Sequence, residues 1–167
     1  MFFYPKEYLE NVREVTLELL KQNNIKGLIL DMDNTIIDYY KNLPEETIKW
    51  CESLKNNGIK MCILSNSNKK DKVNMVANKL KLPYINFALK PFKGGFKKAK
   101  KMLELENNEI AVIGDQIFTD VLGANRMKMF SILVKPIKEK DIWITILKRP
   151  IENFIINNYL KQKNKKW

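Results

Sequence analysis

A short apolar run that ends in two carboxylates constrains this chain more than any other feature. Residues 27–30 read Gly-Leu-Ile-Leu, and Asp31-Met-Asp33 follows them directly. A run of this length after the helix-ending pair Asn23-Asn24 is typical of a strand buried on both faces of a parallel sheet. Ligands bind beyond the carboxyl ends of such strands. Two carboxylates there can meet one small ligand, although the pattern by itself also fits an Asx-turn.

Length and residue content bound the kind of protein. The 167 residues suit one domain, residues 1–167, with one hydrophobic core. Lys and Arg number 30 against 19 Asp and Glu, and the formal net charge of +11 predicts attraction to nucleic acid, anionic lipid or phosphorylated substrates. Histidine is absent, which excludes Ser-His-Asp catalysis and His-ligated zinc. Acid–base work must therefore fall to carboxylates, Lys, Tyr or Cys.

The cysteines and the N-terminal residues indicate a compartment. Cys51 and Cys62 lie in apolar surroundings and are expected to be reduced packing residues. Charges at Lys6, Glu7 and Glu10 interrupt the apolar start of the chain, which does not fit a signal peptide. No apolar run approaches the ~18 residues that a membrane span needs. We therefore expect a cytoplasmic protein, at most peripheral at the inner face of the membrane.

Helical and strand patterns alternate along the chain. Apolar residues at helical spacing predict helices, and short apolar runs predict strands. Such alternation implies right-handed crossovers and a Rossmann-like α/β/α sandwich with a five-stranded parallel sheet. The segment from about 141 to 167 is expected to be amphipathic and basic, with Trp143, Phe154 and Tyr159 among clustered lysines. The predicted helices cover about 5–22, 44–57, 70–81, 94–105 and 119–128, and the predicted strands 27–31, 59–64, 83–89, 109–115 and 130–134.

Four reactive side chains follow predicted strands at their carboxyl ends. They are Asp31, Ser65, Lys90 and Asp115. A parallel sheet brings those ends to one edge, so carboxylates, a hydroxyl and an ammonium would border one crevice. Carboxylates without histidine suit a hard cation such as Mg²⁺, and Ser65 and Lys90 suit the oxygens of a phosphoryl group. The set indicates phosphoryl transfer.

These residues also carry a resemblance to a known family. Asp31-Met-Asp-Asn-Thr35, Ser65, Lys90-Pro91 and Gly114-Asp115-Gln-Ile-Phe-Thr-Asp120 resemble, in order, the four motifs of the haloacid dehalogenase (HAD) phosphohydrolases. The first motif, the Lys-Pro pair and Gly-Asp-Gln-x-x-Thr-Asp-Val-Leu-Gly-x-Asn-Arg are similar to the YqeG branch of subclass IIIA. That branch is related to the phosphatidylglycerophosphate phosphatases of mitochondria and plastids. Each motif alone is weakly specific, but here all four follow predicted strands in family order.

The resemblance implies a covalent mechanism. Asp31 would attack phosphorus and become an aspartyl phosphate. Asp33 would protonate the leaving oxygen and later activate water. Asp31, Asp115 and the backbone carbonyl of Asp33 would hold Mg²⁺. The metal and Lys90 are needed because a carboxylate attacks a phosphate dianion poorly until the charge of the phosphate is neutralised.

Other residues would bind phosphate or support the site, and each also has a structural interpretation. Ser65 and Lys90 would bind phosphoryl oxygens, with Asn66 as a further contact. Taken alone, Ser65 fits a helix N-cap and Lys90 a solvated surface lysine. Asp120 would support the metal site, or merely place a charge at its helix N-terminus. Thr35 would support the site or hydrogen-bond within its own loop.

The spacing of the motifs bears on the substrate. HAD enzymes that act on small metabolites usually carry a cap domain, and neither the segment from Asp33 to Ser65 nor that from Ser65 to Lys90 has room for one. We expect a large or membrane-borne phosphorylated substrate, with phosphatidylglycerophosphate as the leading candidate and peripheral contact with anionic membrane. The alternatives are a nucleic-acid end phosphatase, a phosphoprotein phosphatase and a non-catalytic basic binding module. Against the first, the sequence shows no evident Arg-rich and aromatic surface on which bases could stack.

Overall fold

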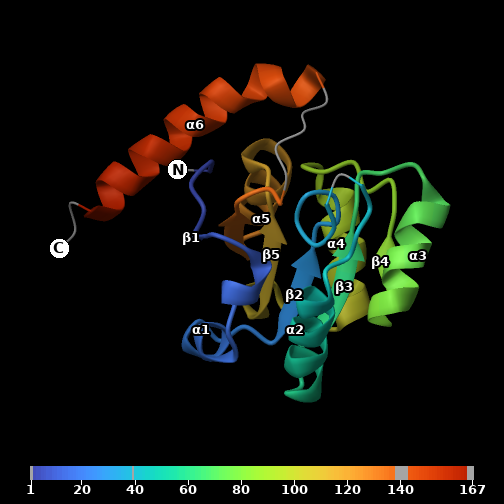
Figure 1. The fold of residues 1–167 in the computed structure, drawn as a ribbon. Coiled ribbons are helices and arrows are strands. Elements are labelled where there is room, and N and C mark those ends of the chain that lie inside the picture. Colours follow the sequence, from blue (N-terminus) through green and yellow to red (C-terminus); the bar gives the residue numbers. More distant parts are fainter. Residues whose placement is uncertain (1, 39, 138–142, 165–167) are drawn as a thin grey trace.

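A six-stranded parallel sheet forms the centre of the structure (Figure 1). The structure is a computed structural model that describes residues 2–38, 40–137 and 143–164. The strands lie side by side in the order β1-β6-β5-β2-β3-β4. The predicted α/β sandwich is confirmed, with six strands in place of five. The strands are β1 (Glu7–Leu9), β2 (Gly27–Leu30), β3 (Lys60–Leu64), β4 (Tyr84–Ile85), β5 (Ile110–Gly114) and β6 (Phe130–Val134).

Helices cover both faces of this sheet. Acidic residues open α2, and left-handed residues end α3 and α4 at Lys81 and Glu104. The described residues also form two 3₁₀ turns and one π turn. The helical elements are η1 (Val12–Glu14), α1 (Leu17–Gln22), α2 (Glu45–Asn56), α3 (Lys70–Leu80), α4 (Lys93–Leu103), η2 (Asn107–Glu109), η3 (Ile117–Val121), α5 (Leu122–Arg126) and α6 (Trp143–Asn164).

The first predicted helix, residues 5–22, was wrong over most of its length, because the α-helix covers only Leu17–Gln22. Its opening residues form β1, which pairs in parallel with the end of β6. The Asn11 side chain then accepts a hydrogen bond from the Arg13 backbone N–H and begins η1, and the Thr16 hydroxyl accepts one from the Leu19 backbone N–H and begins α1. These caps divide the segment, and pairing with a distant strand outweighs its helical spacing.

The third predicted strand, residues 83–89, was too long. β4 covers only Tyr84–Ile85, and the following residues form a loop. Phe87 and Leu89 have φ angles of 48° and 54°, which no β-strand adopts. The alternating apolar residues of this segment therefore do not enter the sheet.

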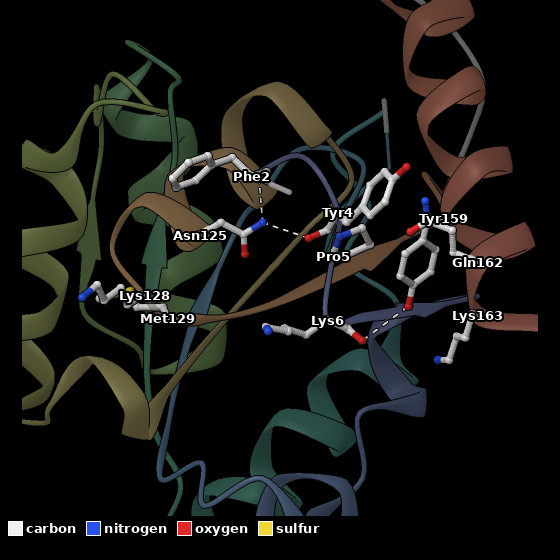
Figure 2. Close-up of a pocket in the computed structure, with 10 residues that line it drawn as sticks. All are labelled: Phe2, Tyr4, Pro5, Lys6, Asn125, Lys128, Met129, Tyr159, Gln162 and Lys163. Carbon is white, nitrogen blue, oxygen red and sulfur yellow. Dashed lines mark hydrogen bonds between the residues drawn. The ribbon is translucent and has the colours of Figure 1, made fainter. Parts of the chain in front are cut away.

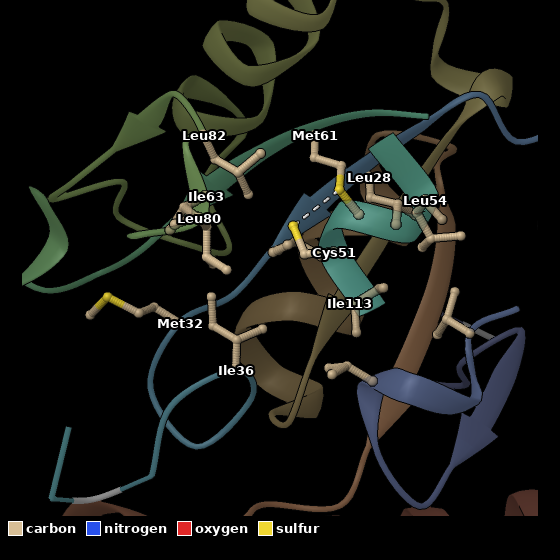
Figure 3. Close-up of a cluster of buried hydrophobic side chains, with 14 of the residues drawn as sticks. Leu28, Met32, Ile36, Cys51, Leu54, Met61, Ile63, Leu80, Leu82 and Ile113 are labelled. Atoms are coloured by element: carbon tan, nitrogen blue, oxygen red, sulfur yellow. Dashed lines mark hydrogen bonds between the residues drawn. The ribbon is translucent and has the colours of Figure 1, made fainter. Parts of the chain in front are cut away.

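Strand side chains alternate between two hydrophobic clusters, one on each face. Leu28 and Leu30 of β2 pack with residues of α2 and α3, and Figure 3 shows Leu28 beside Cys51 and Leu54 of α2. Ile29 points the other way and packs with Phe96 of α4. This alternation follows from the two-residue period of a strand, and it accounts for the continuous apolar run that ends at Asp31.

The two cysteines are packing residues, as expected. Cys51 and Cys62 are buried, and both thiols are free. Burial raises the pKa of Cys51 to about 11 and that of Cys62 to about 12, so both stay protonated at neutral pH. Neither thiol is therefore a candidate nucleophile.

The C-terminal helix α6 lies beside the β1 edge of the sheet (Figure 1). Ile155 is buried in a cluster with Ile117 and Leu133, and Tyr159 is buried with its ring edge-on to Tyr4, whereas Phe154 is exposed. None of the described helices is long and apolar enough to cross a membrane. Residues 141–142, the Trp143 side chain and residues 165–167, which the sequence placed in the amphipathic segment, lie outside the described part of the chain.

Candidate active site

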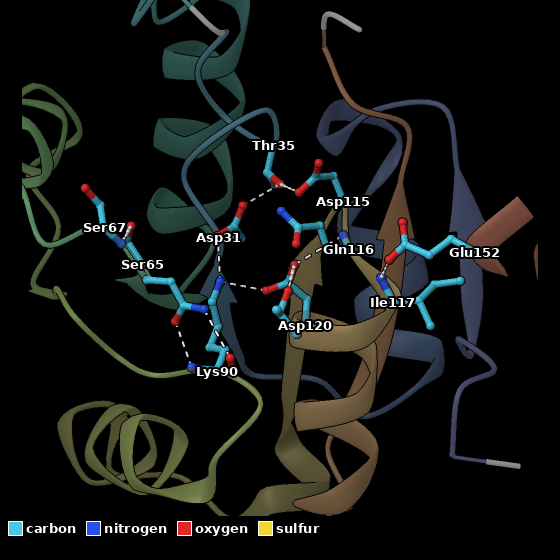
Figure 4. A network of polar contacts seen from close by, with 12 residues as sticks. Asp31, Thr35, Ser65, Ser67, Lys90, Asp115, Gln116, Ile117, Asp120 and Glu152 are labelled. Atoms are coloured by element: carbon cyan, nitrogen blue, oxygen red, sulfur yellow. Dashed lines mark hydrogen bonds and ion pairs between the residues drawn. The ribbon is translucent and has the colours of Figure 1, made fainter. Parts of the chain in front are cut away.

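The carboxyl ends of β2, β3 and β5 carry the reactive side chains to one edge of the sheet (Figure 4). Asp31 directly follows β2, and its backbone N–H donates to the Ile113 carbonyl at 2.8 Å, so the pairing of β2 with β5 fixes its position. Ser65 follows β3, and Asp115 follows β5. The predicted juxtaposition is therefore present. The roles assigned to these residues stay predictions.

A buried lysine ties the edge together. The Lys90 Nζ lies 2.5 Å from Asp31 Oδ1 and 2.6 Å from Asp120 Oδ1. Burial works against the charged ammonium, but the carboxylates of Asp120 and Asp31 outweigh it and raise the pKa of Lys90 above its ordinary value. Lys90 is thus a permanent positive charge beside Asp31, which is the place where a phosphate would meet it.

Three carboxylates surround that one ammonium. Asp31, Asp115 and Asp120 each offer an oxygen within 4.8 Å of the others. Burial raises the pKa of Asp115 well above its ordinary value, and Asp31 and Asp120 add to the shift. Burial likewise raises the pKa of Asp120 to about 6, against the opposing effect of Lys90. Oxygen donors with excess negative charge fit a hard divalent cation. The Asp120 side chain joins Asp31 and Asp115 in this trio, and the contribution of the Asp33 backbone carbonyl stays a prediction.

The raised pKa values of Asp115 and Asp120 predict how a metal stabilises the protein at different pH. In metal-free protein, the contribution of Asp120 to the free energy of unfolding is fully present below its unfolded pKa, near 3.8, and is lost as pH rises through about 6. A divalent cation binds the deprotonated carboxylates and replaces what was lost. Saturating Mg²⁺ should raise the melting temperature by ~5–10 °C at about pH 7.5 and by less than half of that at about pH 5.

Differential scanning fluorimetry with and without Mg²⁺ at both pH values measures this difference. Asp115→Asn is the matched variant, because it should lose most of the shift near neutral pH. Equal Mg²⁺ shifts at both pH values would contradict the carboxylate site.

Asp33 makes a contact that the sequence did not predict. Its carboxylate forms an ion pair with the ammonium of Lys72, in the first turn of α3, and it lies outside the carboxylate trio. The Asp33 side chain is 43% exposed, so it stands at the rim of the edge. Sequence reasoning missed Lys72 because the run Lys69-Lys70-Asp71-Lys72 is typical of a solvated helix start.

Hydrogen bonds from neighbouring residues hold Asp31 and Lys90 in place. The Thr35 hydroxyl donates to Asp31 Oδ2 at 2.9 Å. The Asn66 side chain accepts from the Lys90 backbone N–H at 2.7 Å and donates to the Lys90 carbonyl at 3.1 Å. The structure thus uses the Asn66 amide to fix the Lys90 backbone, and its predicted phosphate contact stays a prediction. The Ser65 hydroxyl accepts from the Ser67 backbone N–H at 3.1 Å and remains able to donate.

A close approach places Asp120 against β5. Asp120 lies in the π turn η3, and its Oδ2 accepts a hydrogen bond from the Gln116 backbone N–H at 3.2 Å. A Cβ on Gly114 would overlap the Asp120 carboxylate, so only glycine fits at the end of β5. Gly114 therefore lets Asp120 reach Lys90. The Asp120 side chain thus faces the site and contacts Lys90, which is more than placing a charge at a helix N-terminus.

Cavities lie both beside this edge and away from it. A cavity of about 350 Å³ adjoins the site and is lined by residues that include Asp115, Gln116 and Glu152. A larger one of about 770 Å³ lies near the amino ends of β1 and β6, between residues such as Lys6 and Lys163 (Figure 2). None of the reactive side chains lines the larger cavity. We therefore place the chemistry at the carboxyl edge.

A parallel α/β sheet with an aspartate after its central strand, a buried lysine and further aspartates at the same edge is the arrangement that the resemblance to HAD phosphatases implies. Comparisons with known proteins agree. The family described as mitochondrial PGP phosphatase matches residues 1–138. The "Probable phosphatase YqeG" of Bacillus subtilis (strain 168) is 38% identical over 167 residues, which covers 99% of this chain and 96% of that protein.

Two more distant proteins are also similar. "Phosphatidylglycerophosphate phosphatase 1, chloroplastic/mitochondrial" of Arabidopsis thaliana is 21% identical over 173 residues, and the match covers 96% of this chain but 49% of that protein. A solved structure of an uncharacterized Listeria monocytogenes protein has a TM-score of 0.57 and 18% identity, over 71% of this chain and 85% of that one, and it supports the fold. The chain belongs to the PGP phosphatase family, as a YqeG-type phosphatase.

Proposed function

We propose that this phosphatase is Mg²⁺-dependent, works through an aspartyl phosphate on Asp31 and removes the terminal phosphate of phosphatidylglycerophosphate. The observation that carries the chemistry is the pairing of Asp31 with Lys90 at 2.5 Å beside Asp115 and Asp120. A phosphoryl group placed there meets a nucleophile and a positive charge at once.

In the first step, an Asp31 oxygen attacks phosphorus while the bond to the leaving oxygen breaks. Thr35 keeps one Asp31 oxygen hydrogen-bonded, and Lys90 passes from the other oxygen to the phosphoryl group. Asp33 leaves Lys72, takes up a proton from solvent, turns inward and gives that proton to the leaving oxygen. In the second step, Asp33 takes a proton from water, which attacks phosphorus and releases phosphate from Asp31.

Asp31, Asp115 and the backbone carbonyl of Asp33 would hold Mg²⁺, with Asp120 beside them as a further carboxylate. The bound ion would supply positive charge to the phosphoryl oxygens during transfer. Lys90 supplies the protein's own share of that charge.

Three features support a lipid substrate. The described residues between Asp33 and Ser65 form only α2 and β3 besides loops, and those between Ser65 and Lys90 only α3 and β4, so neither set contributes a cap. An uncapped edge can meet a phosphate that projects from a surface. The +11 net charge favours an anionic membrane, and the Arabidopsis relative is named for this lipid. We infer peripheral action at the inner face of the cytoplasmic membrane.

Phosphate release tests the substrate directly. The protein with Mg²⁺ is given phosphatidylglycerophosphate in vesicles, a 3′-phosphorylated oligonucleotide and a phosphopeptide. We expect the lipid to be the preferred substrate. Release from the oligonucleotide or the peptide alone would overturn the lipid and leave the phosphatase chemistry, whereas no release from any ester would favour a non-catalytic basic module.

A further inference from the structure

The loop between β4 and α4 presents three large apolar side chains to solvent. Phe87, Leu89 and Phe92 are 59%, 52% and 66% exposed, whereas Ala88 and Lys90, which lie among them, are each 6% exposed. This inverts the usual preference, because a lysine is buried while its phenylalanine and leucine neighbours meet water. The inward direction of Lys90 follows from its contact with Asp31. The outward direction of the apolar side chains is not explained in the same way, because these side chains point away from the protein core.

The loop is held in this arrangement by the site itself. The Phe87 backbone N–H donates to the Ser67 carbonyl, and the Ala88 N–H to the Ser65 carbonyl, each at 2.9 Å. Asn66 fixes the Lys90 backbone, as described above. Phe87 and Leu89 adopt positive φ angles, a strain that persists where surroundings over-determine it and that often marks a functional site. The apolar side chains therefore stand on a fixed support at the rim of the active site.

The charge around the loop is mainly positive, with Asp71 beside Lys70 as an exposed carboxylate. Residues 86–103 contain six lysines and no Asp or Glu. Lys93 and Lys97 at the start of α4 are exposed, as are Lys69 and Lys70 in the segment that follows Ser67. An exposed apolar group surrounded by lysines complements an anionic lipid surface. It does not suit a second copy of this chain, which would bring another net charge of +11.

We propose that residues 86–92, here called the apolar loop, dock the protein on an anionic bilayer. Phe87, Leu89 and Phe92 enter the membrane interface, and the lysines around them contact lipid phosphates. Because the apolar loop carries Lys90, docking brings the phosphate of a membrane lipid to the site without a cap. The inference rests on the proposed lipid substrate and adds the surface through which the protein reaches it. The apolar loop takes the role of docking surface, and not the C-terminal segment, in which Tyr159 is buried.

The test compares a loop variant with a matched control in vesicle co-sedimentation. Phe87→Asn with Leu89→Asn removes two apolar side chains, and Asn tolerates positive φ, so the loop conformation is kept. Met102→Gln is the control, because Met102 is 41% exposed in the last turn of α4, at the opposite edge of the sheet. On vesicles of phosphatidylglycerol and phosphatidylcholine, each loop substitution should weaken binding ~10-fold or more, the share of one buried Phe or Leu.

A second readout separates docking from catalysis. Hydrolysis of p-nitrophenyl phosphate, which needs no membrane, should be unchanged in the loop variant and in Met102→Gln, while phosphate release from lipid in vesicles falls with binding. Unchanged vesicle binding by the loop variant would overturn the proposal. A change in mass by light scattering with vesicle binding kept would assign the apolar loop to contact between copies, which also overturns it.

Substitutions of the lysines beside the apolar loop test the proposed contacts with lipid phosphates. Lys93→Glu with Lys97→Glu should weaken binding to anionic vesicles and leave the weak binding to pure phosphatidylcholine unchanged. Equal loss on both would contradict contacts between these lysines and lipid phosphates.

The parent protein separates docking from the choice of substrate. If it docks through the apolar loop but does not hydrolyse phosphatidylglycerophosphate in vesicles or in detergent micelles, the docking surface is supported and the proposed substrate is wrong. If micellar lipid is hydrolysed without any vesicle binding, the proposed function is supported and docking through the apolar loop is wrong.

Discussion

Asp31→Asn is expected to abolish phosphate release while the protein stays folded. Asparagine has nearly the same shape as aspartate but cannot attack phosphorus, so kcat should fall by on the order of 10⁴–10⁶. The fold should survive because Lys90 keeps its second partner, Asp120, at 2.6 Å. The substitution also removes one of three crowded carboxylates, and with it a charge that raises the pKa of Asp115 in addition to burial.

Phosphate release and the thermal midpoint, measured on the same preparation, check this expectation. Asp71→Asn is the matched control, because Asp71 is an exposed aspartate in the first turn of α3 and lies outside the carboxylate trio. It should leave both values near those of the parent. Activity of Asp31→Asn within a few fold of the parent would rule out a covalent intermediate on this residue.

The positions of the reactive residues were predictable because they depend on local pattern and on one topological rule. Each apolar strand run ended where a polar residue began, and a parallel sheet gathers such ends at one edge. Asp31, Ser65 and Asp115 therefore came together without knowledge of the strand order, whereas Lys90 reaches the same edge from the loop after β4. The two-sided burial of β2 was also visible, since its four residues are continuously apolar.

Long-range pairings were not predictable, because no local signal encodes them. Residues 7–9 carry helical spacing but join β6, more than a hundred residues away. Lys72 looks like a solvated lysine until the fold sets it against Asp33. The apolar residues Phe87 and Leu89 read as strand, but the contact of Lys90 with Asp31 and the hydrogen bonds from the loop to Ser65 and Ser67 turn them outward. These departures lie at or near the site, where local preferences yield to tertiary contacts.

Lys90→Met should combine a large loss of activity with a loss of stability that depends on pH. Methionine has a similar length but no charge, so Asp31, Asp115 and Asp120 would face one another without a cation. Removing one partner of a buried ion pair costs ~3–5 kcal/mol. In metal-free protein this loss should be largest at about pH 7.5, where Asp115 and Asp120 must ionise, and smaller at about pH 5, where burial lets these two retain protons. Without the ammonium beside the phosphoryl group, kcat should fall by ~10²–10³.

Denaturant unfolding at both pH values and turnover of p-nitrophenyl phosphate measure the two effects. Lys101→Met is the control, because Lys101 is exposed near the end of α4, at the opposite edge of the sheet, and should change neither. Saturating Mg²⁺ should recover more stability in Lys90→Met than in the parent, since the cation then supplies the only positive charge among the three carboxylates. It should not restore turnover, because Lys90 is proposed to hold a phosphoryl oxygen itself. Full recovery of both by Mg²⁺ would reduce Lys90 to a structural counter-ion.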